Sequence, residues 1–285
     1  MLRQLQIGCV HFVFNLPATY QWGAKDLRFR AETPQPNSRL VEVIVERSET
    51  LDEPQDAPVF RSESLSVWAY KDMEIRSYRA LFLPGYPLYA ISKCCDNRVN
   101  IQFDFSTGAW SHPNMLLWAL VHLENLLLEA DSILLHSCYT QYQGKAILFT
   151  APSGTGKTTQ ANIWRRVYGS EIVNGDITLL QQSLQGWEAC GFPISGSAEE
   201  CENENYPIGA IVIVRQAQNN WIEPLSPLRQ VQLLYSECFV NTWNKARINR
   251  VFNLIEDLVA KVPVLLLHCN MGDEAAHVLY DYLKL

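Results

Sequence analysis

Residues 146–159 (AILFTAPSGTGKTT) constrain the fold more than any other part of this sequence. An apolar run suited to a buried strand leads into Gly154 and Gly156, which permit a tight turn. A lysine and two threonines follow, and the chain from there to about residue 167 is compatible with a helix. A strand, a tight loop and a helix in this order predict an α/β domain.

The same order is the sequence context of a phosphate-binding loop, or P-loop. In such a loop the backbone N–H groups of the glycine-rich turn point inward, and the N-terminus of the following helix adds partial positive charge. Lys157 would contact the terminal phosphates of a nucleoside triphosphate, and the Thr158 hydroxyl would bind magnesium. ATP and Mg²⁺ are the ligands that we expect. The predicted nucleotide-binding residues are Ser153, Gly154, Thr155, Gly156, Lys157, Thr158 and Thr159.

Ala151 is the one departure from the strict P-loop pattern, which begins with glycine. Alanine is compatible with this position if its φ angle is negative. The alternative is a chance Gly-Lys-Thr sequence in an ordinary loop. The apolar strand before the loop and the helix after it argue against that alternative.

The rest of the chain divides at about residue 111. Residues 1–111 are mostly strand-like, with apolar and polar residues alternating at 40–46 and 98–105, and we expect a mostly-β N-terminal domain with an antiparallel sheet. Residues 112–285 begin with a helix at 114–130 and continue as alternating strands and helices. The strands are expected at 132–136, 146–150, 171–173, 210–214 and 264–268, with a polar loop after residue 136 and helices from about residues 227 and 273. The predicted fold class is therefore α/β with a mixed sheet.

Composition excludes several classes of protein. A formal net charge of −7 argues against binding to duplex nucleic acid. No apolar run approaches the ~20 residues of a membrane helix, and residues 1–15 look like a strand rather than a signal sequence. The eight cysteines include no C-x-x-C pair, which favours free thiols. We expect a cytoplasmic protein without a membrane partner.

Residues 136–164 (HSCYTQYQGKAILFTAPSGTGKTTQANIW) resemble HPr kinase/phosphorylase and its relatives, which share a nucleotide-binding core with ATP-dependent phosphoenolpyruvate carboxykinase. In that family a strand ending in histidine precedes the P-loop by the interval that separates His136 from Ala151. The resemblance extends over about residues 112–285 and is similar to a divergent branch linked to peptide modification. It implies a P-loop core of the HPr-kinase type, and a homo-oligomer is possible by the same analogy.

The resemblance also implies catalytic residues. Residues 172–177 (IVNGDI) stand where the family carries an Asp-Asp pair, so Asp176 takes the role of the magnesium-binding aspartate. The first aspartate of that pair, the general base, is replaced by Gly175. Three explanations remain open: Asp176 serves both metal and proton, His136 substitutes as base, or transfer is weak or absent. The predicted catalytic residues are Asp176, His136 and Lys157, and the metal ligands are Thr158 and Asp176.

Structural roles compete with these assignments. His136 is also compatible with a packed strand-end histidine, and Asp176 with a turn residue of an Asn-Gly-Asp sequence. Arg215 either reaches the transferring phosphate or is a solvated charge. The loop 191–204 either closes over an acceptor or is an ordinary surface loop.

The function expected from this resemblance is transfer of the γ-phosphate of ATP to a hydroxyl group, that of a Ser or Thr in a peptide or protein. The N-terminal domain would recognise the substrate or a partner. Two alternatives are a kinase of a small metabolite and a nucleotide-binding regulatory or scaffold module without turnover. The glycine at position 175 favours the module.

Overall fold

The computed structural model describes residues 2–18, 20–107, 113–196 and 199–284, which form two compact units, Met1–Ala130 and Asp131–Leu285. The expected boundary at 111/112 falls in a segment outside the described residues. The division comes later in the chain because the helical segment that follows belongs to the first unit. Tyr78 donates to the carbonyl of Ala119 (3.1 Å), and the Trp118 indole donates to Asp26 (2.9 Å). These bonds hold the segment to the first unit.

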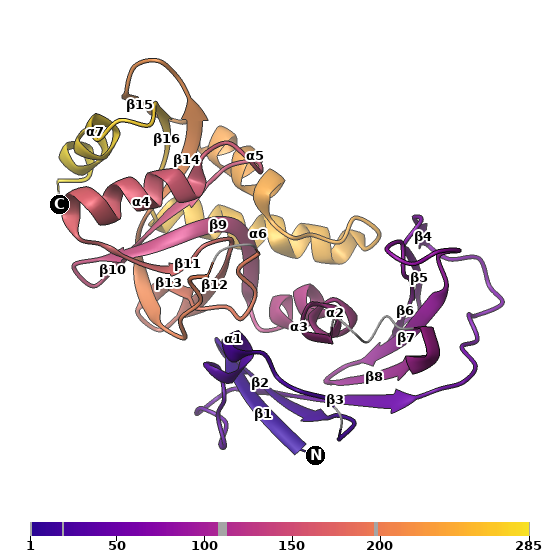
Figure 1. Cartoon of the computed structure of the whole chain (residues 1–285). Coiled ribbons are helices and arrows are strands. Elements are labelled where there is room, and N and C mark those ends of the chain that lie inside the picture. The colour runs from indigo at the N-terminus through magenta and orange to yellow at the C-terminus, as the bar shows by residue number, and fades with distance from the viewer. Residues whose placement is uncertain (1, 19, 108–112, 197–198, 285) are drawn as a thin grey trace. The chain divides into compact units, whose positions relative to one another are not determined.

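The first unit contains one mixed sheet in the order β1-β2-β3-β8-β7-β6-β5-β4 (Figure 1). The expectation of an antiparallel sheet was wrong at β3, which pairs in parallel with both β2 and β8. The connection between β2 and β3 is long and contains α1, so it can cross over and return in the same direction. The elements of this unit are β1 (Leu2–Ile7), β2 (Val10–Asn15), α1 (Ala24–Leu27), β3 (Arg39–Arg47), β4 (Phe60–Arg61), β5 (Leu65–Ala69), β6 (Glu74–Arg79), β7 (Leu88–Cys95), β8 (Arg98–Phe103), a 3₁₀ turn (Phe105–Thr107), α2 (Pro113–Leu120) and α3 (Leu123–Leu128).

The second unit is an α/β unit built on a second mixed sheet, in the order β10-β9-β12-β13-β14-β16-β15. An additional parallel pairing joins β10 to β14, so β10, β9, β12, β13 and β14 form a closed circuit. Its elements are β9 (Ser132–Tyr142), β10 (Lys145–Thr150), α4 (Lys157–Tyr168), β11 (Glu171–Asn174), β12 (Ile177–Ser183), β13 (Gly186–Cys190), β14 (Asn205–Gln216), β15 (Trp221–Glu223), α5 (Pro227–Glu237), α6 (Lys245–Lys261), β16 (Val264–Cys269) and α7 (Glu274–Leu283).

The core of the second unit lies between the sheet and two helices. Ala161, Ile163 and Trp164 of α4 join the buried residues of α7 against apolar side chains of β10, β14 and β16. The helices α5 and α6 pack against each other and against β9, outside this cluster (Figure 1). The cluster fixes the direction in which α4 leaves the sheet and so positions the loop before it.

Most predicted strands and helices of this unit are present, but the polar loop predicted after residue 136 is wrong. Strand β9 continues to Tyr142 and pairs with β10. Its polar side chains are buried and bonded: Ser137 donates to Thr178 (2.7 Å), and Thr140 donates to Ser170 (2.9 Å). Hydroxyl groups that are satisfied inside the core look like loop residues in a sequence, which explains the error.

The predicted helix at 114–130 is divided into α2 and α3. His122 adopts φ 55° between them, a left-handed conformation that interrupts the helical path. The chain therefore turns at a buried histidine rather than continuing straight.

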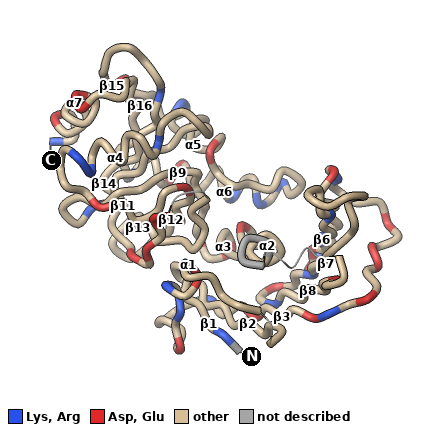
Figure 2. The backbone as a smooth tube through the Cα atoms, viewed as in Figure 1, with Lys and Arg blue, Asp and Glu red and all other residues tan. Residues whose placement is uncertain are grey.

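Among the described residues, no helix is long and apolar enough to cross a membrane. All eight cysteines are described by the structure, and none of them forms a disulfide. Acidic and basic residues are interspersed along both units (Figure 2).

Candidate functional site

A glycine-rich loop, residues 151–156, joins β10 to α4. Gly154 has φ 79° and Gly156 has φ 113°, conformations that residues with a Cβ rarely adopt. Ala151 is fully buried and has a negative φ, so alanine fits the position where the P-loop pattern has glycine. Ser153 and Gly154 are exposed, and Lys157 and Thr158 belong to the first turn of α4.

The loop lies at the edge of the sheet where the parallel strands β10, β14 and β16 end. Gln216, at the end of β14, donates to the carbonyl of Thr155 (3.1 Å). Gln160 of α4 donates to the carbonyl of Asn270, which follows β16 (2.9 Å). Ligand sites in α/β sheets form at this carboxyl edge.

A cavity of about 540 Å³ opens beside the loop. Arg215 lies in its wall and is exposed. The volume falls within the range of small-molecule sites. The cavity is lined by Ala151, Pro152, Ser153, Gly154, Thr155, Ile213, Val214, Arg215, Gln216, Leu233, Ser236, Glu237 and Leu266.

Lys157 supplies a buried cation beside the loop, and its side chain is held in place. Only 7% of the residue is exposed. Its ammonium group donates to the carbonyl of Ala151 (2.9 Å) and to Nε2 of His136 (2.9 Å). Burial lowers the pKa of Lys157, and the negative charges of Asp176 and Glu237 act in the opposite direction.

His136 connects Lys157 to two carboxylates. Because Nε2 accepts from Lys157, the ring proton is on Nδ1, which donates to Glu237 (3.3 Å). Asp176 lies on the same side as Lys157, with Oδ1 3.4 Å from Nε2. The sequence predicted that His136 ends its strand, but the residue lies in the interior of β9. Its carbonyl accepts a hydrogen bond from Thr150 (2.8 Å).

Glu237 is the site residue that the sequence did not reveal. It ends α5, far from His136 in the chain, and no motif surrounds it. Its position depends on the segment that follows. Cys238 pairs with Leu135 in an isolated antiparallel β-bridge, and the backbone N–H of Phe239 donates to the carbonyl of Leu134 (3.0 Å). These backbone contacts place the end of α5 beside β9.

Asp176 is positioned by the turn that precedes it. The Asn174 carboxamide oxygen accepts the N–H groups of Asp176 (2.9 Å) and Ile177 (3.0 Å), which closes the turn around Gly175. Asn174 also donates to the carbonyls of Phe192 (2.8 Å) and Ile194 (3.1 Å). Asp176 is therefore a turn residue, and its carboxylate is also partly exposed to solvent.

The segment 191–204 is held down at both ends. Gly191 donates to the carbonyl of Glu204 (2.8 Å), and Glu202 donates to the carbonyl of Val173 (2.8 Å). A Cβ at Gly191 would lie 2.0 Å from the Glu202 carbonyl oxygen. The two ends of the segment are thus bonded to each other, and Glu202 near its C-terminal end is bonded to β11. Ser197 of the predicted loop lies outside the described residues.

The donors at this site fit an anion together with a hard metal ion. The loop and Lys157 supply N–H groups and a cation, while Asp176 and the exposed Thr158 supply oxygens of the kind that Mg²⁺ prefers. No group of three or more His, Cys, Asp or Glu side chains in the described part of the chain is placed to hold a metal by itself. Burial raises the pKa of Cys138 to about 12, which leaves this thiol protonated and unreactive.

Comparison with known proteins identifies the family. The family model described as SynChlorMet cassette protein ScmC matches residues 112–275, more than half of the chain. The chain therefore belongs to the ScmC family. Comparison with curated proteins found no match.

Proposed function

We propose that this ScmC-family protein binds ATP with Mg²⁺ and transfers the γ-phosphate to a hydroxyl group, that of a Ser or Thr in a peptide or protein. The loop 151–156 would act as a P-loop in a core of the HPr-kinase type. The observation that carries the proposal is the buried ammonium group of Lys157 beside a loop with two left-handed glycines, at the carboxyl edge of parallel strands.

The residues of the loop divide the work of binding. Backbone N–H groups of Gly154, Thr155 and Gly156 would contact the phosphates. Lys157 would exchange its contacts with the Ala151 carbonyl and His136 for the terminal phosphates. Thr158 and Asp176 would hold Mg²⁺, which supplies charge neutralisation when bound. Ser153 and Thr159 complete the set, and Arg215 at the cavity rim is within the same opening.

The acceptor proton needs a base that position 175 does not supply. His136 is suited to this role because Glu237 holds its proton on Nδ1 and leaves Nε2 as an acceptor. In the structure Nε2 accepts from Lys157. Once Lys157 contacts the phosphates, Nε2 becomes available to an acceptor hydroxyl.

A second candidate function is a nucleotide-binding regulatory or scaffold module. Gly175 favours it, since the carboxylate expected at that position is absent. A kinase of a small metabolite would use the same nucleotide site and differ only in the acceptor. The family name describes a cassette protein, so the acceptor is first sought among proteins encoded with it.

Nucleotide binding is tested by thermal unfolding with ATP and Mg²⁺. We expect the ligand to raise the melting temperature of the wild type, and Lys157→Ala to abolish the increase because the phosphates lose their cation. Lys145→Ala removes an exposed lysine of β10 and serves as the matched control. No increase in the wild type, or an increase retained in Lys157→Ala, would contradict the proposal.

Turnover is tested with γ-labelled ATP and the co-encoded proteins as acceptors. Glu237→Gln is expected to lower kcat about 10–100-fold, because it removes the carboxylate that orients the base, and to leave the ATP-dependent melting shift intact. Glu256→Gln changes an exposed carboxylate of α6 and should have no effect. Tight binding without transfer or hydrolysis would favour the regulatory module.

A further inference from the structure

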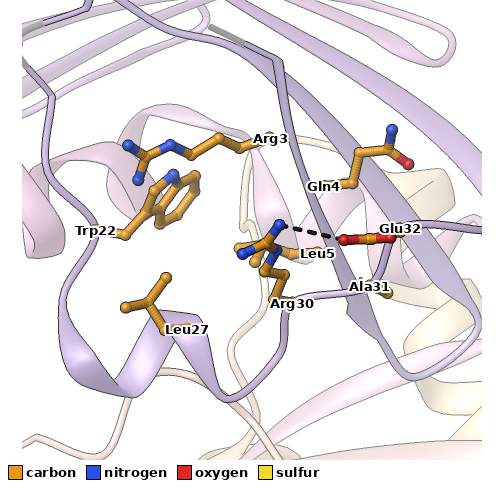
Figure 3. A pocket seen from close by; sticks show the side chains of 8 residues that line it. All are labelled: Arg3, Gln4, Leu5, Trp22, Leu27, Arg30, Ala31 and Glu32. Atoms are coloured by element: carbon orange, nitrogen blue, oxygen red, sulfur yellow. Dashed lines mark hydrogen bonds and ion pairs between the residues drawn. The ribbon is translucent and has the colours of Figure 1, made fainter.

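The first unit contains a second cavity, of about 550 Å³, that is separate from the loop 151–156. It lies between β1 and the segment that contains α1 and the residues after it (Figure 3). Both apolar and charged side chains line it. They are Arg3, Gln4, Leu5, Trp22, Leu27, Arg30, Ala31 and Glu32.

Trp22 has a hydrogen-bond donor without an acceptor. The residue is 8% exposed. Its ring makes edge-to-face contacts with Phe14 and Tyr20, at distances of 5.0 Å and 5.2 Å between ring centroids. Its Nε1 atom is buried and has no hydrogen-bond partner. The neighbouring Trp118 is different, because its indole donates to Asp26 (2.9 Å). Buried indole N–H groups normally find a partner, so the Trp22 donor points to a missing acceptor.

A positively charged side chain, Arg3, lines the same cavity as Trp22. Figure 3 shows the Trp22 nitrogen on the side of the ring that faces the Arg3 guanidinium group. Two kinds of N–H donor thus belong to the lining of one cavity. A carboxylate has two oxygens and can accept from both, and the planar guanidinium group matches its geometry.

The charge of the lining favours a ligand with one negative charge. Arg3 and Arg30 contribute two positive charges and Glu32 one negative charge, which leaves one positive charge. Both side chains of the Arg30–Glu32 ion pair (3.2 Å) are exposed, so replacing Glu32 by a ligand carboxylate as the partner of Arg30 would cost little free energy. A phosphate dianion would exceed this balance, and a carboxylate would match it.

The floor and the wall of the cavity favour an apolar group next to that carboxylate. Leu5 and Leu27 both line the cavity, and Leu5 is buried whereas Leu27 is half exposed. An apolar ligand group that covers Leu27 and the Trp22 ring would remove apolar surface from water.

We propose that this cavity is a binding site for a carboxylate attached to an apolar group, in which the carboxylate contacts Arg3 and the Trp22 indole and the apolar group contacts Leu5 and Leu27. The ligand is either the C-terminus of a peptide or a free organic acid, which share this chemistry. The site does not depend on the nucleotide site in the second unit.

The test uses the full chain labelled with 5-fluorotryptophan and followed by ¹⁹F NMR. The Trp22→Phe variant assigns the Trp22 resonance. N-acetyl-leucine and N-acetyl-leucinamide are the probes, because they differ only in the carboxylate. We expect N-acetyl-leucine to shift the Trp22 resonance and the amide to leave it in place. The experiment contains no nucleotide, so its result is independent of Lys157.

Variants identify the charges that carry the affinity. Arg3→Gln and Arg30→Gln are each expected to weaken binding of N-acetyl-leucine at least about tenfold. Arg47→Gln removes an exposed arginine at the end of β3, outside the cavity, and should leave affinity unchanged. Melting curves of the three variants check that they fold equally well.

A short alanine peptide ending in leucine separates the two sources of carboxylate. Tighter binding of its free-acid form than of N-acetyl-leucine assigns the site to a peptide C-terminus, and equal binding assigns it to a free acid. Equal shifts with N-acetyl-leucine and N-acetyl-leucinamide would overturn the proposal. So would the absence of any shift at about 10 mM ligand, the limit of weak binding.

Discussion

Gly196 is the residue whose substitution most directly tests the position of Asp176. Its φ is +54°, and a Cβ at this position would lie 2.5 Å from Oδ2 of Asp176. The carboxylate therefore occupies space that is available only because residue 196 is glycine. The missing side chain at Gly196 thus makes room for the Asp176 carboxylate.

Gly196→Ala is predicted to weaken the magnesium-dependent part of ATP binding, because the new methyl group displaces the Asp176 carboxylate. Its left-handed backbone should also cost about 1 kcal/mol of unfolding free energy. Gly144→Ala is a matched control, since Gly144 has φ +75° and no atom near its Cβ position. Both variants should lose stability in thermal unfolding, but only Gly196→Ala should reduce the ATP-dependent shift. Equal shifts in the two variants would contradict this account.

At the scale of single residues, the sequence predicted His136, Lys157 and Asp176 together, and the structure brings them into one set of contacts. The resemblance to the HPr kinase family implied that His136 and Asp176 belong to the same site as Lys157. Glu237 was not predictable, because its position depends on how α5 returns to β9. Thr158, which was predicted as a metal ligand, is exposed in α4. The contacts that join His136, Lys157 and Asp176 do not include it.

The break between α2 and α3 belongs to the scale of elements. His122 lies at the break and is fully buried, and its ring contacts Ser92 of β7 (2.6 Å) and Glu74 of β6 (3.2 Å). Arg76 of β6 and Glu124 of α3 complete the charged groups around it. Burial, reinforced by the charge of Arg76, lowers the pKa of His122 to about 4. The helices are therefore joined to the sheet through a neutral histidine.

Stability of the first unit is predicted to fall as pH decreases from about 6.5 to about 4. His122 has a folded-state pKa below 6.5, the pKa of an unperturbed histidine, so the unfolded chain binds more protons in this window. Its contribution is complete above the window and decreases by up to about 1.4 kcal/mol per pH unit within it. His122→Asn, which tolerates the left-handed backbone, should reduce this slope in urea unfolding. An unchanged slope would show that the carboxylates alone cause it.

The elements also show where hydrophobic periodicity is informative. Alternation in β3 predicted its buried valines, and the caps of α5 and α6 agree with their sequences, since Ser226 and Asn244 accept the N–H groups of Arg229 and Arg247. The second half of β9 was missed, because its buried residues include hydroxyl groups bonded within the core.

At the scale of the molecule, the chain forms two units with separate sheets and separate candidate sites. A ligand that binds one folded unit stabilises it by mass action, by about 2.7 kcal/mol at one hundred times its dissociation constant. The ligand therefore lowers the population of opened states in the unit that binds it, and the backbone amides of that unit exchange more slowly.

Hydrogen exchange with mass spectrometry tests this division. ATP with Mg²⁺ is predicted to slow exchange in the loop 151–156, in α4 and in the turn at 174–176, where it contacts or orders the backbone. Exchange in β3 and β8 of the first unit should change little. Lys157→Ala provides the control and should show no protection. Protection confined to the first unit would place the nucleotide elsewhere.

The sequence by itself determined the strand, loop and helix around residues 146–167, because local backbone preferences and apolar periodicity act over a few residues. It did not determine the parallel pairing of β3, the division after Ala130 or the contact of Glu237 with His136. Each of these depends on contacts between segments far apart in the chain, and only the packing of the whole unit selects among the possible partners. Local chemistry predicted a phosphate-binding loop at residues 151–156, and the tertiary structure placed Glu237 beside His136.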